Sequence, residues 1–354
     1  MNHVQTIQKT SQQWLLWVFL TCTLALCGCG QQGPEQDLEN YLGRLATTLD
    51  TDQPNVTIAP IPKPPKISKL RYTLAAGNLH ALDFLALSGC KVQVTIGKRN
   101  SSLGKLAKAS QRLLLELEYL QYAPECIQFM YKTGKTELAE NLESAYTLKK
   151  AQLPKLIFNA TLASSEFRSF WKKPASIADY PAQTNSTVLQ SLGAITKDVE
   201  RWLLGDYQAN NTRFEIHLSE VAMGDGGALW LALGHQGAAL MAGNLILGKS
   251  FARGPLCSDR YRSPAADILP NVIHKYFITE IQPWSAALGK RYHELIPAVA
   301  ALEDLLQDDL SEEYVHYQEA RNTAMSALTN RPKEHVEAIK KVLNSCQNKS
   351  PLNI

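Results

Sequence analysis

Residues Ser186–Tyr207 (STVLQSLGAITKDVERWLLGDY) carry a regular pattern of apolar side chains. The apolar positions are three or four residues apart: Leu189, Leu192, Ile195, Val199 and the pair Trp202-Leu203. Side chains at this spacing lie on one stripe of an α-helix, and the polar side chains between them face away. The stretch therefore predicts an amphipathic helix packed on a hydrophobic core.

The same spacing recurs along most of the chain, whereas strand-like alternation is nearly absent. A helix is expected after Ser102, with Leu103, Leu106, Leu113, Leu117 and Leu120 on one face. Further helices are expected at about 34–49, 74–87, 136–151, 154–171, 267–281, 284–308, 312–329 and 332–346. Pro34, Pro124 and Pro332 each indicate a helix start, because proline suits the first turn. The predicted fold class is all-α, a multi-helix bundle.

One short segment has the period of a strand. Val92, Val94 and Ile96 alternate with polar residues, which indicates a short strand near 91–97. Since a lone strand has no expected partner here, at most one isolated strand is predicted.

Residues Gly226–Gly248 carry no formal charge when His235 is neutral, and so resemble a membrane span. The segment also contains Gln236, Asn244 and several glycines, in a chain that is expected to be exported whole. A buried central helix pair, apolar on all sides, is the favoured interpretation. A hydrophobic ligand groove lined by small residues is the functional alternative.

The N-terminus resembles the signal of a bacterial lipoprotein. An apolar run, Trp14–Leu26, is followed by Leu26-Cys27-Gly28-Cys29. The run is too short to span a bilayer, which takes ~20 apolar residues. We expect residues 1–28 to be a signal peptide and Cys29 to carry lipid such as palmitate. An ordinary signal peptide cut nearby and a non-cleaved anchor are the alternatives. Gly30 is not the Asp of the inner-membrane retention signal, so the periplasmic face of the outer membrane is the expected location.

Removing 28 of the 354 residues leaves 326, and the net charge falls from +3 to about +2 because Lys9 is lost. That balance gives no reason to expect a nucleic-acid partner. The expected organisation is a tether and N-terminal helix at 29–51, a Pro-rich linker at 52–66, and one large helical domain at 67–354. The linker either holds the N-terminal helix away from the main body or wraps across it.

Four cysteines remain after Cys22 and Cys27 leave with the signal and Cys29 takes lipid. An even number in an oxidising compartment predicts two disulfides. Of the three pairings that can be drawn, we expect Cys90–Cys126 and Cys257–Cys346, because pairing close in sequence joins neighbouring elements. The Cys spacing does not support a metal site.

A cationic segment offers a candidate anion site. An expected helix N-terminus at Asn100, Ser101 and Ser102 is flanked by three cations, Lys98, Arg99 and Lys105. Cations there oppose the helix dipole unless an anion lies between them and the free amides. The structural alternative has Ser102 capping the helix and Arg99 paired with a carboxylate of another helix, and capping is the commoner use of such a serine.

Two catalytic or metal motifs are incomplete. Ser102-x-x-Lys105 and Lys132-Thr133-Gly134 match parts of the penicillin-binding protein pattern, but they lie too close together and lack an S-x-N between them. Glu313-x-x-His316 is half of a di-iron site, and no second pair follows. We therefore assign no catalytic residue, no metal ligand and no cofactor.

The chain resembles a family of Gram-negative lipoproteins known only as a domain of unknown function. The resemblance rests on the lipoprotein signal, Arg99–Lys105, an Ile281-Gln282-Pro283 turn, and the closing His335-Val336 helix with Cys346. It spans nearly all of the chain after the signal and implies an envelope location. It implies no activity or substrate.

Two functional hypotheses follow. The first is a non-enzymatic, lipid-anchored lipoprotein that binds or scaffolds an envelope component. The second is an envelope enzyme or small-ligand receptor for an anion at Arg99–Lys105. A receptor or enzyme predicts a concave pocket with convergent titratable groups, whereas a scaffold predicts an exposed apolar patch or groove.

Overall fold

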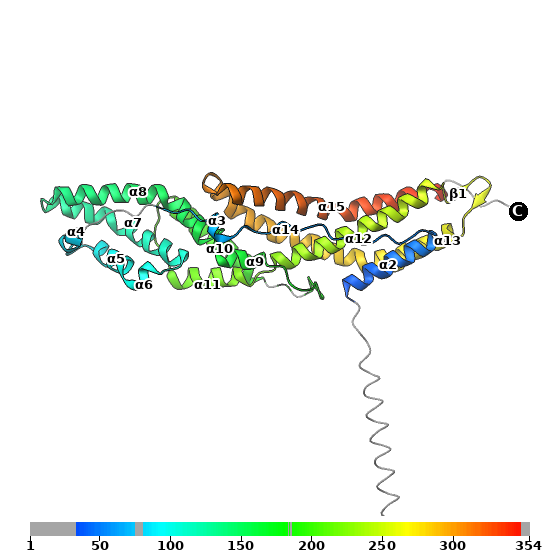
Figure 1. Cartoon of the computed structure of the whole chain (residues 1–354), viewed down its shortest axis with the longest axis horizontal. Helices are drawn as coiled ribbons and strands as arrows, with labels where there is room; N and C mark the ends of the chain where they lie inside the picture. The colour runs from blue at the N-terminus through cyan, green and yellow to red at the C-terminus, as the bar shows by residue number, and fades with distance from the viewer. Residues whose placement is uncertain (1–32, 75–80, 183, 185, 348–354) are drawn as a thin grey trace, which may run out of the picture.

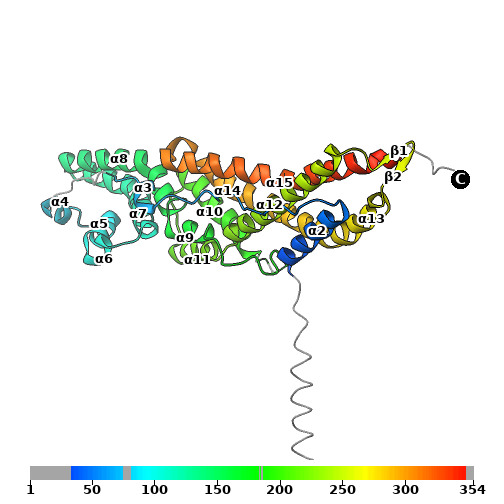
Figure 2. The same ribbon diagram turned by 45° about the vertical axis from the view of Figure 1, so that its right-hand side comes forward.

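The computed structural model describes residues 33–347 except 75–80, 183 and 185. Its helices run side by side along one long axis and give an elongated body (Figures 1 and 2). The only strands among the described residues form one short antiparallel hairpin. The predicted all-α, multi-helix fold is confirmed. The lipidation site Cys29 lies outside the described residues.

The N-terminal half is built from α2 (Pro34–Thr48), α3 (Ile67–Leu70), α4 (Ala81–Ala86), α5 (Lys91–Asn100), α6 (Ser102–Lys105), α7 (Ala109–Lys132), α8 (Thr136–Ala160) and α9 (Ser165–Phe170). The C-terminal half is built from α10 (Thr187–Leu203), α11 (Asn211–Ala222), α12 (Gly226–Ala252), β1 (Cys257–Ser258), β2 (Tyr261–Arg262), α13 (Ala265–Val272), η2 (Ile273–Ile281), α14 (Gln282–Leu305), η3 (Gln307–Asp309) and α15 (Glu312–Gln347).

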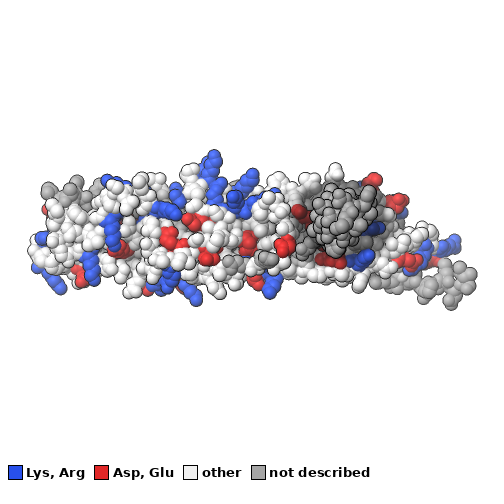
Figure 3. Space-filling model, turned by 90° about the horizontal axis from the view of Figure 1, so that it is seen from below, with Lys and Arg blue, Asp and Glu red and all other residues white. Residues whose placement is uncertain are grey.

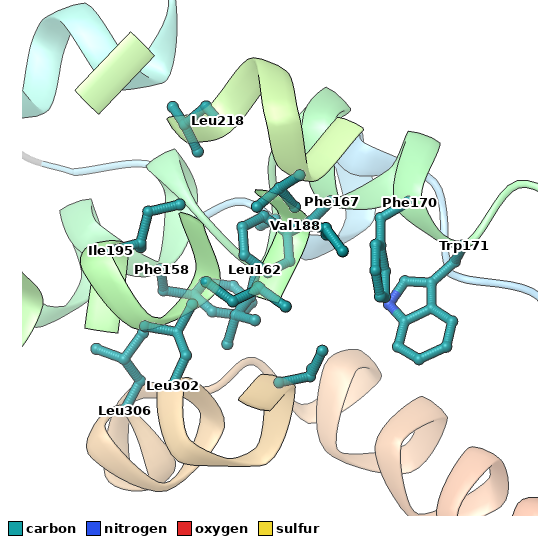
Figure 4. Close-up of a cluster of buried hydrophobic side chains, with 14 of the residues drawn as sticks. Phe158, Leu162, Phe167, Phe170, Trp171, Val188, Ile195, Leu218, Leu302 and Leu306 are labelled. Atoms are coloured by element: carbon teal, nitrogen blue, oxygen red, sulfur yellow. The ribbon is translucent and has the colours of Figure 1, made fainter. Parts of the chain in front are cut away.

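The helix predicted from Ser186–Tyr207 is α10. Leu192, Ile195, Val199 and Trp202 are fully buried on its inner face. Figure 4 shows Ile195 and Val188 of α10 in the central core. There they meet Phe158 of α8, Leu218 of α11 and Leu302 of α14, among others. The spacing of the apolar residues therefore predicted this helix and its buried face correctly.

The strand expected near 91–97 is wrong, because these residues belong to helix α5. Val92 and Ile96 are four residues apart and lie buried on one helical face, with Thr95 beside them. Val94 points outward and is 59% exposed. The apolar positions of this short alternating run also fit one face of a helix, because residues i and i+4 lie on the same face.

Several helices run straight through prolines, and two of these prolines, Pro124 and Pro332, were expected to start a helix. α7 contains Pro124, α8 contains Pro154 and α15 contains Pro332. The expected Ile281-Gln282-Pro283 turn is also wrong, because α13, η2 and α14 follow one another without a break. Within η2, Thr279 Oγ1 donates to the His274 carbonyl five residues earlier at 2.9 Å.

The expected helix after Ser102 is broken in two. α6 ends at Lys105, and α7 begins at Ala109. Leu113, Leu117 and Leu120 are buried as expected, but Leu103 and Leu106 are 84% and 85% exposed. The face predicted for Leu103 and Leu106 is therefore wrong.

The apolar segment at 226–248 forms one buried helix, α12, rather than a helix pair. It packs against α15, α2 and α14. A Cβ at Gly243 would lie 2.8 Å from His335 Cε1, so glycine allows α12 and α15 to approach closely. Among the described residues, no helix is both long and apolar enough to cross a bilayer.

The Pro-rich linker runs along the body as an extended strap between α2 and α3 (Figure 1). Arg253 donates to the Asp50 carbonyl at 2.7 Å at one end of it. Arg168 donates to the Pro65 carbonyl at 2.5 Å at the other end. Between them, Ile58 lies over Gly234 of α12. Of the two arrangements considered, the linker takes the one that wraps across the body.

Both expected disulfides are present. Cys90 bonds to Cys126, joining the start of α5 to α7, and Cys257 bonds to Cys346, joining β1 to α15. The two bonds lie toward opposite ends of the long body (Figure 1). Each therefore braces a different part of the molecule.

Candidate anion-binding site

A cavity of about 620 Å³ lies where four segments meet in the half of the body that holds α5 to α8. The chain just after the strap, Ser68–Leu74, forms one wall. The α5–α6 corner, the N-terminal half of α7 and the C-terminal half of α8 form the others. The site is therefore assembled from parts of the chain that are far apart in sequence.

Positive charge dominates the lining. Six cationic side chains and one carboxylate contribute: Arg71, Arg99, Lys105, Lys108, Arg112 and Lys149, with Glu116 as the carboxylate. Cations from four segments repel one another, and a concave wall concentrates their field. An anion in the cavity would relieve that repulsion and gain charge-assisted hydrogen bonds.

Glu116 holds the innermost part of the site together. It accepts a short hydrogen bond from Lys149 Nζ, and its other oxygen lies 3.1 Å from Arg99 Nε. Lys149 also lies over the ring of Tyr119, 5.0 Å from its centroid. Burial lowers the pKa of Lys149, and the positive charge of Arg99 acts in the same direction against the attraction of Glu116. Lys149 and Glu116 form the buried base of the cavity, and the half-buried Arg99 lies beside them, paired with Glu116.

The α5–α6 corner presents the residues that were predicted from the sequence. Arg99, Asn100 and Lys105 line the cavity, whereas Ser101 and Ser102 do not. Ser101, not Ser102, is the N-cap of α6, since its hydroxyl accepts from Gly104 N at 3.0 Å. The contact of Arg99 with Glu116 was anticipated by the structural alternative. That alternative accounts for Arg99 and leaves the convergence of the other five cations of the lining unexplained.

One face of α7 supplies the opposite wall. Lys108, Arg112 and Glu116 are spaced by four residues and so lie on one side of the helix. Arg112 Nη2 donates to the Lys105 carbonyl at 3.0 Å, which fixes α6 against α7. The four-residue spacing of these charged residues was visible in the sequence. It did not distinguish a cavity wall from an ordinary solvated helix face, which has the same pattern.

The segment after the strap is held in place by Asn159 of α8. Its side-chain amide accepts from Tyr72 N and donates to the Tyr72 carbonyl, both at 2.9 Å. Arg71 is thereby placed at the cavity wall. Desolvation lowers the pKa of Arg71, and the nearby charge of Arg112 adds to this effect against the opposing influence of Glu166. No local pattern could have linked Arg71 to Arg99, because tertiary packing brings them together.

A smaller recess of about 60 Å³ shares Arg99, Glu116 and Lys149 with the main cavity. Thr95 lines it and is 2% exposed. The Thr95 hydroxyl has no hydrogen-bond partner. A buried polar group without a partner is costly, so this hydroxyl is suited to a bound group that enters the recess.

The other motifs do not form sites. Glu313 and His316 are both exposed on α15. Within the described part of the chain, no three His, Cys, Asp or Glu side chains converge as metal ligands.

The comparisons with known proteins identify the family but no relative of known function. The model of a family described as "Protein of unknown function (DUF3080)" matches residues 38–350. No curated protein and no solved structure matches the chain. Because the family match covers most of the sequence, the chain belongs to the DUF3080 family of proteins of unknown function.

Proposed function

We propose that this protein is a lipid-anchored envelope lipoprotein that binds an anionic small molecule in the basic cavity. The observation that supports the proposal is the convergence of six cations around one carboxylate. The whole chain has a net charge of only +3, so this local excess is not a consequence of a basic composition. Phosphate and carboxylate groups are the anions that such side chains bind best.

The size and construction of the cavity suit a small molecule. Its volume of about 620 Å³ lies within the range of ligand pockets, roughly 300–1,000 Å³. Lys149 and Arg99 are already held by Glu116, so they need little reordering on binding. Lys105, Lys108 and Arg112 lie farther out, and their side chains are exposed. A ligand with one anionic group at the base and another near the rim would engage both sets.

The proposed location rests on the sequence around Cys29. Lipid on that residue would tether the protein to the periplasmic face of the outer membrane. Scaffolding of an envelope component is the second candidate function, and the exposed leucines of α6 favour it. The proposal assigns binding to this cavity and no reaction.

Calorimetric titration with inorganic phosphate tests the proposal. The protein is the mature chain, residues 29–354, with Cys29→Ser so that it carries no lipid. We expect the parent protein to bind phosphate saturably. Each of the single variants Arg99→Met and Arg112→Met should bind it roughly tenfold or more weakly, because each loses a charge-assisted hydrogen bond. Arg260→Met is the matched control, since Arg260 lies in the hairpin near the other end. Equal phosphate affinity in all four proteins would contradict the proposal.

A further inference from the structure

Two leucines are exposed to solvent beside the basic cavity: Leu103 in the short helix α6, and Leu106 immediately after it. Leu103 and Leu106 are 84% and 85% exposed, the highest values among large apolar side chains in the described residues. Gly104 and Lys105, which lie between them, line the cavity. An apolar pair at the rim of a charged site is unusual on a soluble surface, where exposed leucines are normally scattered singly.

The fold holds these leucines in a fixed position. The Ser101 hydroxyl caps α6, and Arg112 binds the Lys105 carbonyl. Gly104 sits against the end of α5, where a Cβ would lie 2.2 Å from the Lys98 carbonyl oxygen. α6 is thus fixed to both α5 and α7, and its leucines have no apolar neighbours that would bury them.

The surroundings of the pair are basic. Lys105 and Lys108 are exposed around α6, and Lys98, also exposed, is paired with Glu118 at 2.8 Å. Figure 3, which looks onto the lower edge of the body, shows Lys and Arg side chains along the end where Figure 1 places α5 and α6. A few acidic side chains are also visible at that end, and more of them lie nearer the middle. Apolar side chains within a basic collar match the interface of an anionic bilayer, where leucines enter the acyl boundary and lysines meet the headgroups.

The proposed anchor would bring this edge to a membrane. Only four residues lie between Cys29 and Pro34, the first residue of α2. The five steps along the chain from Cys29 to Pro34 reach at most about 18 Å. Figures 1 and 2 place the start of α2 and α6 on the same lower edge of the body. With Cys29 in a bilayer, that edge would face the lipid surface.

We propose that α6 docks the protein on an anionic phospholipid surface, with Leu103 and Leu106 in the interface and a lipid headgroup phosphate in the basic cavity. This inference rests on the proposed anion binding, and it makes the ligand a component of the membrane rather than a free solute. A second copy of the chain, or a protein partner, would be the other occupants of the same surface.

Vesicle sedimentation of the mature chain with Cys29→Ser tests the docking. We expect sedimentation with vesicles of phosphatidylethanolamine and phosphatidylglycerol, and little with vesicles of phosphatidylcholine alone. The double variant Leu103→Ser/Leu106→Ser should bind the anionic vesicles roughly tenfold or more weakly, because two leucines no longer leave water. Met241→Ser/Leu245→Ser on α12 is the control, since these side chains are 45% and 54% exposed, and it should bind like the parent protein.

Inorganic phosphate titration of the same proteins separates the two proposals. The leucine double variant should keep the parent's phosphate affinity, which also shows that it is folded. If the parent binds phosphate but does not sediment with anionic vesicles, the docking inference is wrong and the proposed function stands. If neither is bound, both fail. If the leucine double variant sediments with anionic vesicles as well as the parent does, the docking role is wrong. It is also wrong if the substitutions abolish a dimer of the protein rather than its binding to vesicles.

Discussion

Gly104 connects a single backbone position to the candidate ligand site. A methyl group there would overlap the carbonyl oxygens of Lys98 and Arg99, at 2.2 and 2.5 Å. Gly104→Ala should push α6 away from α5 and so displace Arg99 and Lys105 from their positions in the cavity wall. We expect weaker phosphate binding by calorimetry and a loss of about 1–3 kcal/mol in the free energy of unfolding.

Gly193→Ala is the matched control for that change. Gly193 lies inside α10, and nothing lies within 4 Å of the position a Cβ would take. Alanine is the better helix former by about 0.5–1 kcal/mol, so this variant should be slightly more stable in urea and bind phosphate normally. A Gly104→Ala protein that matched it would show that α6 does not shape the cavity.

His335 is a buried residue whose charge state should make stability depend on pH. Its Nε2 is 2.7 Å from the Tyr41 hydroxyl, and its Nδ1 is 2.6 Å from Asn244 Oδ1. A neutral ring satisfies both contacts by donating from Nδ1 to Asn244 and accepting at Nε2 from Tyr41. Burial lowers the pKa of His335 to about 4.

Below pH ~6.5 the unfolded chain protonates this histidine before the folded chain does. Stability should therefore be complete above that pH and decline as the pH falls toward 4, by about 3 kcal/mol from this residue. Urea unfolding at pH 7, 6, 5 and 4.5 measures the decline. His335→Gln should reduce the slope, whereas His274→Gln, at an exposed position of η2, should not. Equal slopes in all three proteins would contradict the assignment.

At the residue scale, the sequence identified only part of the site. Arg99, Asn100 and Lys105 were found because they cluster within seven residues. Arg71 and Lys149 reach the same cavity from distant positions, and only the packed structure reveals that. Thr95 was placed on a strand, so its buried hydroxyl could not be recognised.

Among the elements, prolines inside helices were the main source of wrong boundaries. Proline lacks the amide hydrogen that a helix interior uses, so a start at each proline is the default expectation. In α7, α8 and α15 the apolar face continues past the proline, and packing keeps one helix intact. The sequence alone does not show that this burial outweighs the lost hydrogen bond.

Pro332 allows that balance to be measured. It lies inside α15, where an N–H would otherwise bond to the carbonyl four residues earlier. Pro332→Ala should restore that bond and raise the free energy of unfolding by about 1–3 kcal/mol. Pro34→Ala is the control, because Pro34 is at the first position of α2 and should change stability little. A destabilised Pro332→Ala protein would mean that the local helix geometry at Pro332 is required for packing.

For the whole molecule, the long shape reflects several buried clusters rather than one core. A central cluster around α8, α10 and α14 lies between one at the α2, α12 and α15 end and one at the α5 to α8 end. The all-α class followed from spacing that is local in the chain, and the disulfide pairing followed from joining cysteines that are close in sequence, 36 and 89 residues apart. The order of the clusters did not, because α2 and α15 meet across nearly the full sequence, as the contact between Tyr41 and His335 shows.

This separation predicts that the two disulfides stabilise different parts of the molecule, and that only one of them affects anion binding. Cys90–Cys126 braces the cluster beneath the cavity, whereas Cys257–Cys346 belongs to the cluster at the opposite end. Loop closure suggests that each contributes about 4 kcal/mol. Cys90→Ser/Cys126→Ser should speed hydrogen exchange in α5 and α7 and weaken phosphate binding. Cys257→Ser/Cys346→Ser should speed exchange in the hairpin and the end of α15 while phosphate affinity stays the same. If either double variant changed hydrogen exchange along the whole chain, the three clusters would unfold as one cooperative unit. Removing either disulfide would then affect the cavity equally, which would contradict the prediction.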